Sequence, residues 1–427
     1  MKNSGIEWIG NIPDSWSLSR LQWHLSEIKE SNDPVKTTQV LSLTNKLGVI
    51  PYEEKGDHGN KAKENLNEYK LAYPGTIVAN SMNILIGSVG KCDYFGCVSP
   101  VYYVFKPNDG ENIDFLNYVF QTEQFQKELR RYANGILEIR LRVSASDILK
   151  RQIAFPSSNK QKKIVDFLNI KTEQINKLIE IENNQIENLK EYKQSLITEI
   201  ITNGLDNSST KKDSNIEWIG KISNDASIVR LKYYAYMKGR IGWQGLNSND
   251  FIDCGPFCIT GTDFSNGGIN WDTCYHVSEE RYEMDPYIQV RVGDLLITKD
   301  GTIGKLAKIT HLPDKACLNS HLLIIRPLKN KFTNEYLYYV LSSGIFWKYY
   351  NKISSGAIMA SISQEKMENF SFPVYDLKKQ EEIVRFLDLK CKQIDLLIDT
   401  KIRKIDNILS YKKSLIYEYI TGKKEVS

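Results

Sequence analysis

The sequence contains one unit twice, and this duplication constrains the fold more than any other feature. Residues 4–10 return as residues 214–220, with six of seven positions identical. Residues 161–202 return as residues 380–421, with 20 of 42 positions identical. The middle of each unit aligns poorly with the other. Similar ends around a dissimilar middle predict one scaffold that presents two domains with different tasks, although relaxed drift of a spare domain would leave the same pattern.

The longer repeated segment has the spacing of a coiled-coil seam. Apolar residues recur at alternating steps of four and three in both copies, which is typical of heptads. The seam positions are Ile175, Ile179, Ile186, Leu189, Leu196 and Ile200 in the first copy, and Ile394, Ile398, Ile405, Ile408, Leu415 and Tyr419 in the second. The remaining core positions hold charged residues: Glu182, Lys193, Lys401 and Lys412.

These segments predict two long helices that pack on each other. A helix of 42 residues rises about 63 Å, at about 1.5 Å per residue, and is too long for a small domain to cover. The linker 203–214 is short, so the simplest closed arrangement is antiparallel pairing within the chain, related by an internal two-fold axis. Pairing between two chains in a dimer would give the same heptads.

The two dissimilar middles, which we call heads, both predict mixed α/β structure. Gly75–Asn80 and Gly293–Thr298 have the composition of buried strands. Residues 113–131 and 334–350 have helical apolar spacing, with Phe115, Leu116, Val119 and Phe120, or Tyr336, Leu337, Val340 and Leu341, directed inward. The expected fold class is therefore α+β, with two mixed α/β domains and two long helices forming an antiparallel intramolecular coiled coil with an internal pseudo-two-fold.

The charge balance permits a polyanionic partner without requiring one. There are 56 basic and 52 acidic residues, a net charge of +4, so contact with a polyanion must rest on local patches. A glycine-lysine pair ends residues 87–91 and 301–305, but the spacing is too short for a nucleotide-binding P-loop. The residues that we expect to contact nucleic acid are Lys91, Arg140, Arg142, Arg240, Trp243, Gln244, Lys299 and Lys305. For each of them ordinary solvated surface is the alternative.

No motif of the sequence predicts catalysis or a cofactor site. The five histidines are scattered, and no Pro-Pro pair exists to form the signature of an amino-methyltransferase. The seven cysteines are irregularly spaced, as expected of reduced thiols, and Cys254 and Cys258 lack a second pair for a zinc site. No stretch is apolar enough for a membrane span or a signal peptide, so a cytoplasmic protein is expected.

The order of these motifs resembles the specificity subunits of type I restriction-modification systems over essentially the whole chain. The resemblance lies in residues 6–13, in 293–296 followed by 301–305, and in the helix entry at 380–384. Residues 222–223 are Ile-Ser, where the first copy has Ile12-Pro13. The resemblance implies target-recognition domains at 1–156 and 206–373, the latter including the linker, and spacer helices at 157–205 and 374–427.

The resemblance also implies a function, in which each head reads one half of a split site in double-stranded DNA. The helices would set the spacer and dock two modification subunits, and motor-nuclease restriction subunits would join them. S-adenosylmethionine, ATP and Mg²⁺ would then bind those partners and not this chain, which would be no enzyme itself. The alternatives are a solitary two-headed DNA-binding protein and a protein-interaction adaptor.

Overall fold

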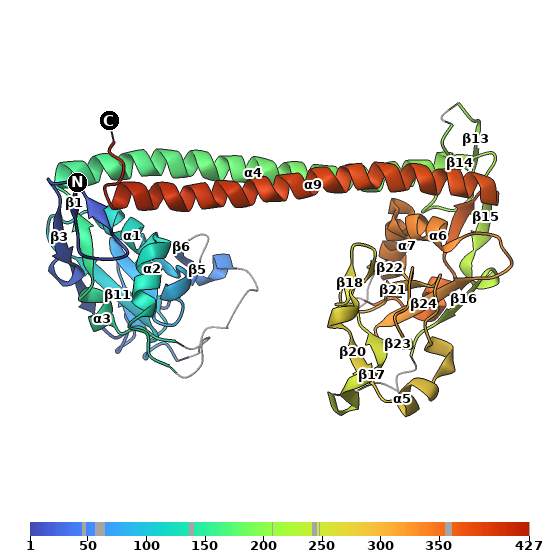
Figure 1. Ribbon diagram of the computed structural model, residues 1–427, viewed down its shortest axis with the longest axis horizontal. Helices are drawn as coiled ribbons and strands as arrows, with labels where there is room; N and C mark the ends of the chain where they lie inside the picture. The colour runs from blue at the N-terminus through green and yellow to red at the C-terminus, as the bar shows by residue number, and fades with distance from the viewer. Residues whose placement is uncertain are drawn as a thin grey trace. The chain divides into compact units, whose positions relative to one another are not determined.

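The computed structural model describes residues 1–44, 48–55, 65–135, 141–206, 208–240, 246, 248–354 and 361–426. The chain forms two compact units, one of Met1–Glu182 with Ile402–Ser427 and one of Asn183–Lys401 (Figure 1). Each unit therefore contains one head and parts of both long helices. No helix within the described ranges combines the length and the apolar character needed to cross a bilayer.

A four-stranded antiparallel sheet forms the centre of the first head. Its strands follow the order β4 (Leu25–Ile28), β11 (Tyr102–Pro107), β8 (Thr76–Asn80) and β9 (Val89–Cys92). Strand β8 is buried along its whole length, which accounts for its run of β-branched and small residues. The smaller strands of the head are β1 (Lys2–Asn3), β2 (Asn11–Ile12), β3 (Ser17–Arg20) and β12 (Gln152–Phe155).

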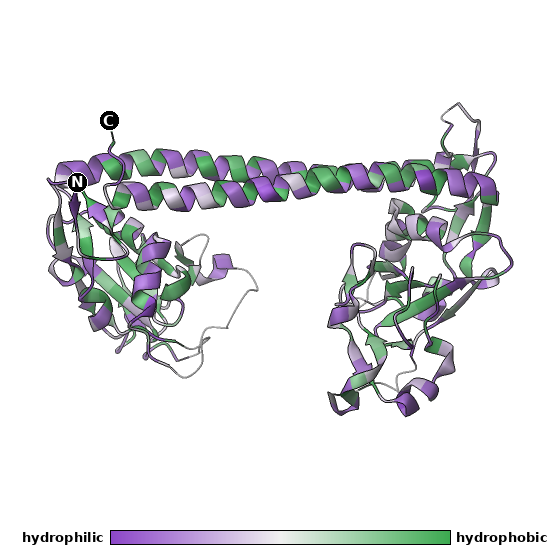
Figure 2. Ribbon diagram, viewed as in Figure 1, coloured by the Kyte–Doolittle hydropathy of each residue, from purple (hydrophilic) through white to green (hydrophobic). Residues whose placement is uncertain are grey.

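The second head repeats this frame. Its central sheet has the order β16 (Ala235–Lys238), β24 (Leu322–Pro327), β21 (Leu295–Thr298) and β22 (Leu306–Lys308). The smaller strands also recur, as β13 (Lys211–Asp213), β14 (Lys221–Ser223), β15 (Ser227–Arg230) and β25 (Ser371–Val374). The strands of both sheets are largely hydrophobic (Figure 2), as burial between two layers requires.

The heads differ in the segment that each inserts between the strands that are first and third in the sheet order. These strands are β4 and β8 in the first head and β16 and β21 in the second. The first head inserts β5 (Leu41–Thr44), β6 (Gly48–Pro51) and β7 (Lys70–Ala72), and β7 pairs with β10 (Gly96–Val98). The second inserts β17 (Phe251–Ile259), β18 (Phe264–Ser265), β19 (Gly268–Ile269), β20 (Tyr275–Val277) and α5 (Glu279–Glu283), and β17 pairs in parallel with β23 (Ala316–Leu318). The poor alignment of the two middles is therefore largely a difference between these insertions.

The helix expected at the end of each head is two helices. In the first head α1 (Ile113–Gln121) and α2 (Glu123–Arg130) are separated by Thr122, whose extended backbone ends α1 while its hydroxyl donates to the Val119 carbonyl at 2.7 Å. In the second, α6 (Asn334–Ser342) and α7 (Gly344–Ser354) are separated by Ser343 in the same way. The apolar residues expected to point inward are all buried, because the break preserves the apolar face of α1 and α6.

The duplicated ends of the sequence join each head to the long helices α4 (Ser158–Asn203) and α9 (Leu377–Ile420). The buried amide of Gln161 donates to the Pro156 carbonyl at 3.0 Å, and that of Gln380 donates to the Tyr375 carbonyl at 2.7 Å. The Tyr417 hydroxyl donates to the Trp8 carbonyl at 2.9 Å, which ties the end of α9 to the first repeated motif. Gln161 and Gln380 recur because both copies form the same helix entry.

The long helices pair antiparallel in both units. In the first unit the rings of Phe167 and Tyr419 lie 4.6 Å apart, and Asn176 accepts a hydrogen bond from Lys412 at 2.8 Å. In the second, Lys193 lies 2.7 Å from Asp395. As the residue numbers of the contacts increase along α4, those of their partners decrease along α9. This confirms the antiparallel pairing expected within the chain. All twelve seam residues are buried or half-buried: Ile175, Ile179, Ile186, Leu189, Leu196, Ile200, Ile394, Ile398, Ile405, Ile408, Leu415 and Tyr419.

The charged residues in the seam all have polar partners on the opposite helix. Glu182, only 5% exposed, pairs with Lys404, and Lys401 donates to Gln185. Lys193 and Lys412 use the contacts described above. Because a buried charge without a partner is costly, these pairs favour one register over its neighbours.

Candidate nucleic-acid interface

Each head has a surface corner where the turn after its third frame strand meets the segment before a short helix. We call this the strand-turn corner, and it comprises residues 81–88 with 142–144 in the first head, and 299–305 with 361–363 in the second. The Ser81 amide donates to Val101, and the Ser81 carbonyl accepts from the Val143 amide, both at 3.3 Å. In the second head the Lys299 amide donates to His321 and the Lys299 carbonyl accepts from Ile362, both at 2.9 Å.

These matching bonds align the start of the two turns and the segments before the two short helices. Ser81 corresponds to Lys299, so the next residue in each turn, Met82 or Asp300, also corresponds. The residues that precede Val143 and Ile362 are Arg142 and Ser361. Both corners end in a short helix, α3 (Ala145–Leu149) or α8 (Gln364–Glu368), whose first turn is capped by Ser144 or Ser363.

The two glycine-lysine pairs do not occupy equivalent places, which corrects their comparison in sequence. The Asn80 amide bonds the Ser88 carbonyl, whereas the Thr298 amide bonds the Lys305 carbonyl, both at 3.0 Å. The second turn is thus one residue shorter, and Lys305 corresponds to Ser88. Lys91 lies within β9 instead, opposite Ile77.

Lys91 is also engaged with protein carboxylates. Its ammonium lies 3.0 Å from Asp114 and 3.8 Å from Asp93. The hydrogen bond to Asp114 raises the pKa of Lys91. A phosphate would have to compete with both carboxylates, so this arrangement favours a structural role over the phosphate contact expected from sequence.

Of the lysines at the second corner, Lys305 is the more accessible. Lys305 is exposed, and no bond or ion pair of its side chain is found within the described ranges. The Lys299 ammonium lies 4.0 Å from Asp300. A cavity of about 750 Å³ opens here, lined by Tyr275, Asp300, Lys305, His321 and Ser361 among others. No pattern in the sequence indicated Tyr275, Asp300, His321 or Ser361, because only folding brings them together.

Arg142 projects from the first corner. Its side chain is exposed, and one guanidinium nitrogen lies 3.7 Å from the Met82 sulfur, a weak acceptor. Its backbone forms an isolated antiparallel bridge with Asn134. Arg140, Trp243 and Gln244 lie outside the described residues.

Arg240 is a core residue of the second head, and its burial does not favour the contact with DNA expected from the sequence. Its side chain is 3% exposed, and Nε donates to the Leu318 carbonyl at 2.9 Å. A terminal nitrogen lies 3.4 Å from the Cys317 sulfur. A hydrogen bond from Cys258, followed by the charge of Arg240, lowers the pKa of Cys317. The guanidinium is therefore bonded to strand β23.

We expect Arg240→Ala to lower the free energy of unfolding by about 1–3 kcal/mol, because the buried Leu318 carbonyl loses its donor. Chemical denaturation would measure this change. Lys238→Ala is the matched control, since Lys238 is exposed on the neighbouring strand β16, and we expect a change of about 0.5 kcal/mol or less. Intact stability combined with lost DNA affinity in Arg240→Ala would contradict the structural role.

The described residues contain no group of three or more His, Cys, Asp or Glu side chains placed to bind a metal. Six of the seven cysteines are buried, all seven are free thiols, and only Cys254 is exposed.

Comparison with known proteins identifies the ones that this chain resembles. The model of the type I restriction modification DNA specificity domain matches residues 246–407. The Putative type I restriction enzyme MjaX specificity subunit of Methanocaldococcus jannaschii is 24% identical over 97% of this chain and 95% of its own length. Along nearly its whole length the chain is similar to a type I restriction enzyme specificity subunit.

Two further comparisons extend this assignment. The Type I restriction enzyme MjaVIII specificity subunit of the same organism is 26% identical over 64% of this chain, and the match spans only 62% of that relative's length. A chain from a structure of type I R-M complex assembly superposes with a TM-score of 0.68 at 14% identity, covering 97% of this chain and 100% of that chain. The two chains therefore share a fold.

Proposed function

We propose that each head reads one half of a bipartite site in double-stranded DNA, and that the paired helices set the spacer between the halves. The observation that supports this most is the repeated frame with different insertions. One scaffold used twice keeps two corners alike in backbone, while the insertions give each corner its own chemistry. A protein that reads two different half-sites needs this combination of equal presentation and unequal contacts.

Local charge supports contact with DNA at the corners. The net charge of +4 is small for the whole chain, but Arg142, Lys299 and Lys305 all lie at the two strand-turn corners. Basic residues that neutralise phosphates release counterions, so affinity for any duplex should fall steeply with salt. The contacts that select a sequence must then come from base edges.

The same proposal assigns catalysis to partners. Two modification subunits that bind S-adenosylmethionine would dock on the helices and methylate adenine, and restriction subunits that use ATP and Mg²⁺ would cut. The charged outer faces of α4 and α9 offer a large surface for docking.

Expression of the chain with its cognate modification subunit, followed by mapping of methylated sites, tests this function. We expect one bipartite motif with a fixed spacer, and co-purification of the two proteins. Salt-dependent duplex binding without a methyltransferase partner would favour a solitary DNA-binding protein. Absence of binding to duplex DNA at low salt would favour a protein adaptor and would overturn the proposal.

A further inference from the structure

We propose that Arg142 in the first head and Asp300 in the second are specificity-determining residues that contact base edges with opposite hydrogen-bonding chemistry. Arg142 would select guanine, and Asp300 would select cytosine. This inference rests on the proposed function, because it requires that each head reads one half-site. It goes further by naming the residue at each corner and the base that it selects.

The equivalence of the two corners is the first step. The backbone bonds of Ser81 and Lys299 match, so Met82 and Arg142 flank the bonded residues of the first head as Asp300 and Ser361 flank those of the second. Asp300 and Ser361 form an isolated antiparallel bridge, and the Arg142 side chain reaches Met82. The two corners therefore present a cation on the segment before α3 in the first head and a carboxylate on the turn after β21 in the second.

Arg142 has the donors that guanine requires. A guanidinium presents five N–H donors in a planar fork, and in the part of the chain that the structure describes this one donates to the Met82 sulfur at 3.7 Å. In the major groove guanine offers two adjacent acceptors, O6 and N7, which this fork matches in a bidentate pair. Thioether sulfur is a weak acceptor, so exchanging it for guanine gains hydrogen bonding.

Asp300 is unsuited to phosphate and suited to an amino group. Its carboxylate is 34% exposed and lies 3.5 Å from His321 Nδ1 and 4.0 Å from the Lys299 ammonium. A carboxylate repels phosphate but accepts a hydrogen bond from the N4 amino group of cytosine. Lys299 and Lys305, in the same turn, supply the positive charge that brings the backbone of DNA close to this acid.

The cavity around Asp300 also joins the common frame to the head-specific insertion. Thr260, Thr262 and Tyr275 of the insertion line it together with Asp300 and Lys305 of the frame turn. The contact is tight, since a Cβ added to Gly261 would lie 2.9 Å from the Thr298 methyl group. An insertion that differs between the heads thus shapes the surroundings of a residue whose place is the same in both.

The test uses the complete chain in complex with its modification subunit, with methylated sites mapped for wild type, Arg142→Ala and Asp300→Ala. We expect each variant to lose discrimination at one base pair, by about 5- to 150-fold, the range for one good contact to a base edge. Arg142→Ala should affect a G·C pair in one half-site and Asp300→Ala a C·G pair in the other. Each unaffected half-site is an internal control.

Two further variants separate base reading from general effects. Lys106→Ala also removes one positive charge from the first head, at the end of β11 that lies away from the strand-turn corner. This variant should leave the motif unchanged. Arg142→Gln should move the preference from guanine toward adenine, because glutamine pairs with adenine N6 and N7. This shift could not arise from misfolding.

The outcomes distinguish this inference from the function on which it rests. If the wild-type complex yields no bipartite motif, the proposed function fails. If wild type yields one and both alanine variants keep it, or both alter the same half-site, only the assignment of Arg142 and Asp300 fails.

Discussion

Seven residues inserted into each long helix are expected to lengthen the preferred spacer by about three base pairs while leaving both half-sites unchanged. Seven residues are one heptad, so the seam continues in register. They add about 10.5 Å of helix at about 1.5 Å per residue, and one duplex turn of roughly 10 base pairs spans about 34 Å. Suitable points are between Asn188 and Leu189 and between Asp399 and Thr400, which lie near each other on the antiparallel pair. Mapping of methylated sites measures the spacer.

The matched control inserts the same seven residues after Ser208, in the loop that follows α4. This lengthens the chain without lengthening either helix, and surface loops tolerate such insertions. The spacer should then stay at its wild-type length. An unaltered spacer in the double helix insertion would show that the helices do not act as a ruler, even if both heads read DNA.

Repetition made the architecture predictable from sequence. The heptads of 161–202 and 380–421 fix two long helices, and the duplicated motifs around Trp8 and Gln161 recur because both copies form the same junction. The α+β class, the two mixed domains and the pairing of the helices within the chain are confirmed. Patterns with a period survive as signals because they reflect one face of a long regular element.

The contacts at the corners were less predictable, because they join residues that lie far apart in the sequence. Because the second turn is one residue shorter, Lys305 corresponds to Ser88, although the sequence aligns Lys305 with Lys91. Arg240 belongs to a run of residues whose composition predicts exposure. Its side chain is nevertheless buried, because it donates to a carbonyl 78 positions later. Asp300 and Ser361 are adjacent only through a single bridge. Such contacts leave no periodic signal in the chain.

Gly422→Ala should destabilise the first unit far more than Gly204→Ala destabilises the second. These glycines follow the ends of α9 and α4, and both have positive φ, +72° and +76°. Each alanine therefore costs about 1–2 kcal/mol for left-handed backbone. A Cβ on Gly422 would also lie 2.5 Å from Pro13 Cδ, which adds about 1–3 kcal/mol of overpacking. Chemical denaturation, with hydrogen exchange in each unit, would measure both.

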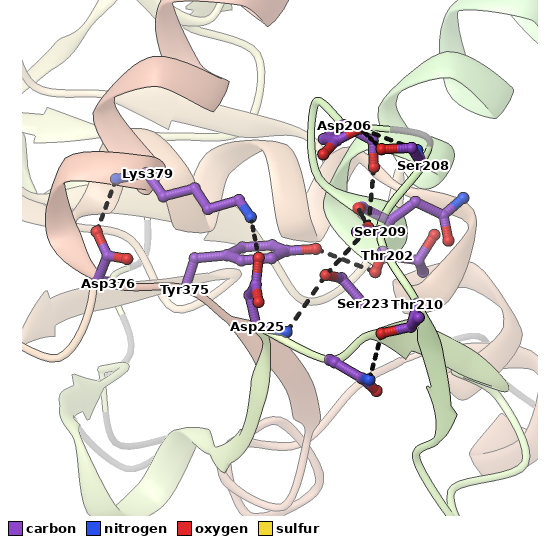
Figure 3. A network of polar contacts seen from close by, with 12 residues as sticks. Thr202, Asp206, Ser208, Ser209, Thr210, Ser223, Asp225, Tyr375, Asp376 and Lys379 are labelled. Carbon is purple, nitrogen blue, oxygen red and sulfur yellow. Dashed lines mark hydrogen bonds and ion pairs between the residues drawn. The ribbon is translucent and has the colours of Figure 1, made fainter.

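Gly204 is a close control because its surroundings can yield. Its Cβ would meet Lys379 Cε at 3.3 Å, on a flexible side chain. Figure 3 shows Lys379 beside Tyr375, whose hydroxyl donates to the Thr202 carbonyl at 3.0 Å, and reaching Asp225 at 2.7 Å. Loss of that exposed ion pair costs about 1 kcal/mol or less.

The difference traces to two departures between the copies, and the larger of them allows a sharper test. Pro13, which makes the shortest contact, is replaced by Ser223 in the second copy, and Trp16, whose Cε2 would lie 3.2 Å from the added Cβ, is replaced by Ala226. Pro13→Ser combined with Gly422→Ala should recover most of the overpacking cost and bring the loss close to that of Gly204→Ala. If the double variant is no more stable than Gly422→Ala, the Pro13 ring is not the cause. A rescue would show that the first copy requires glycine at this helix end for two separate reasons, backbone conformation and close packing, whereas the second requires it for one.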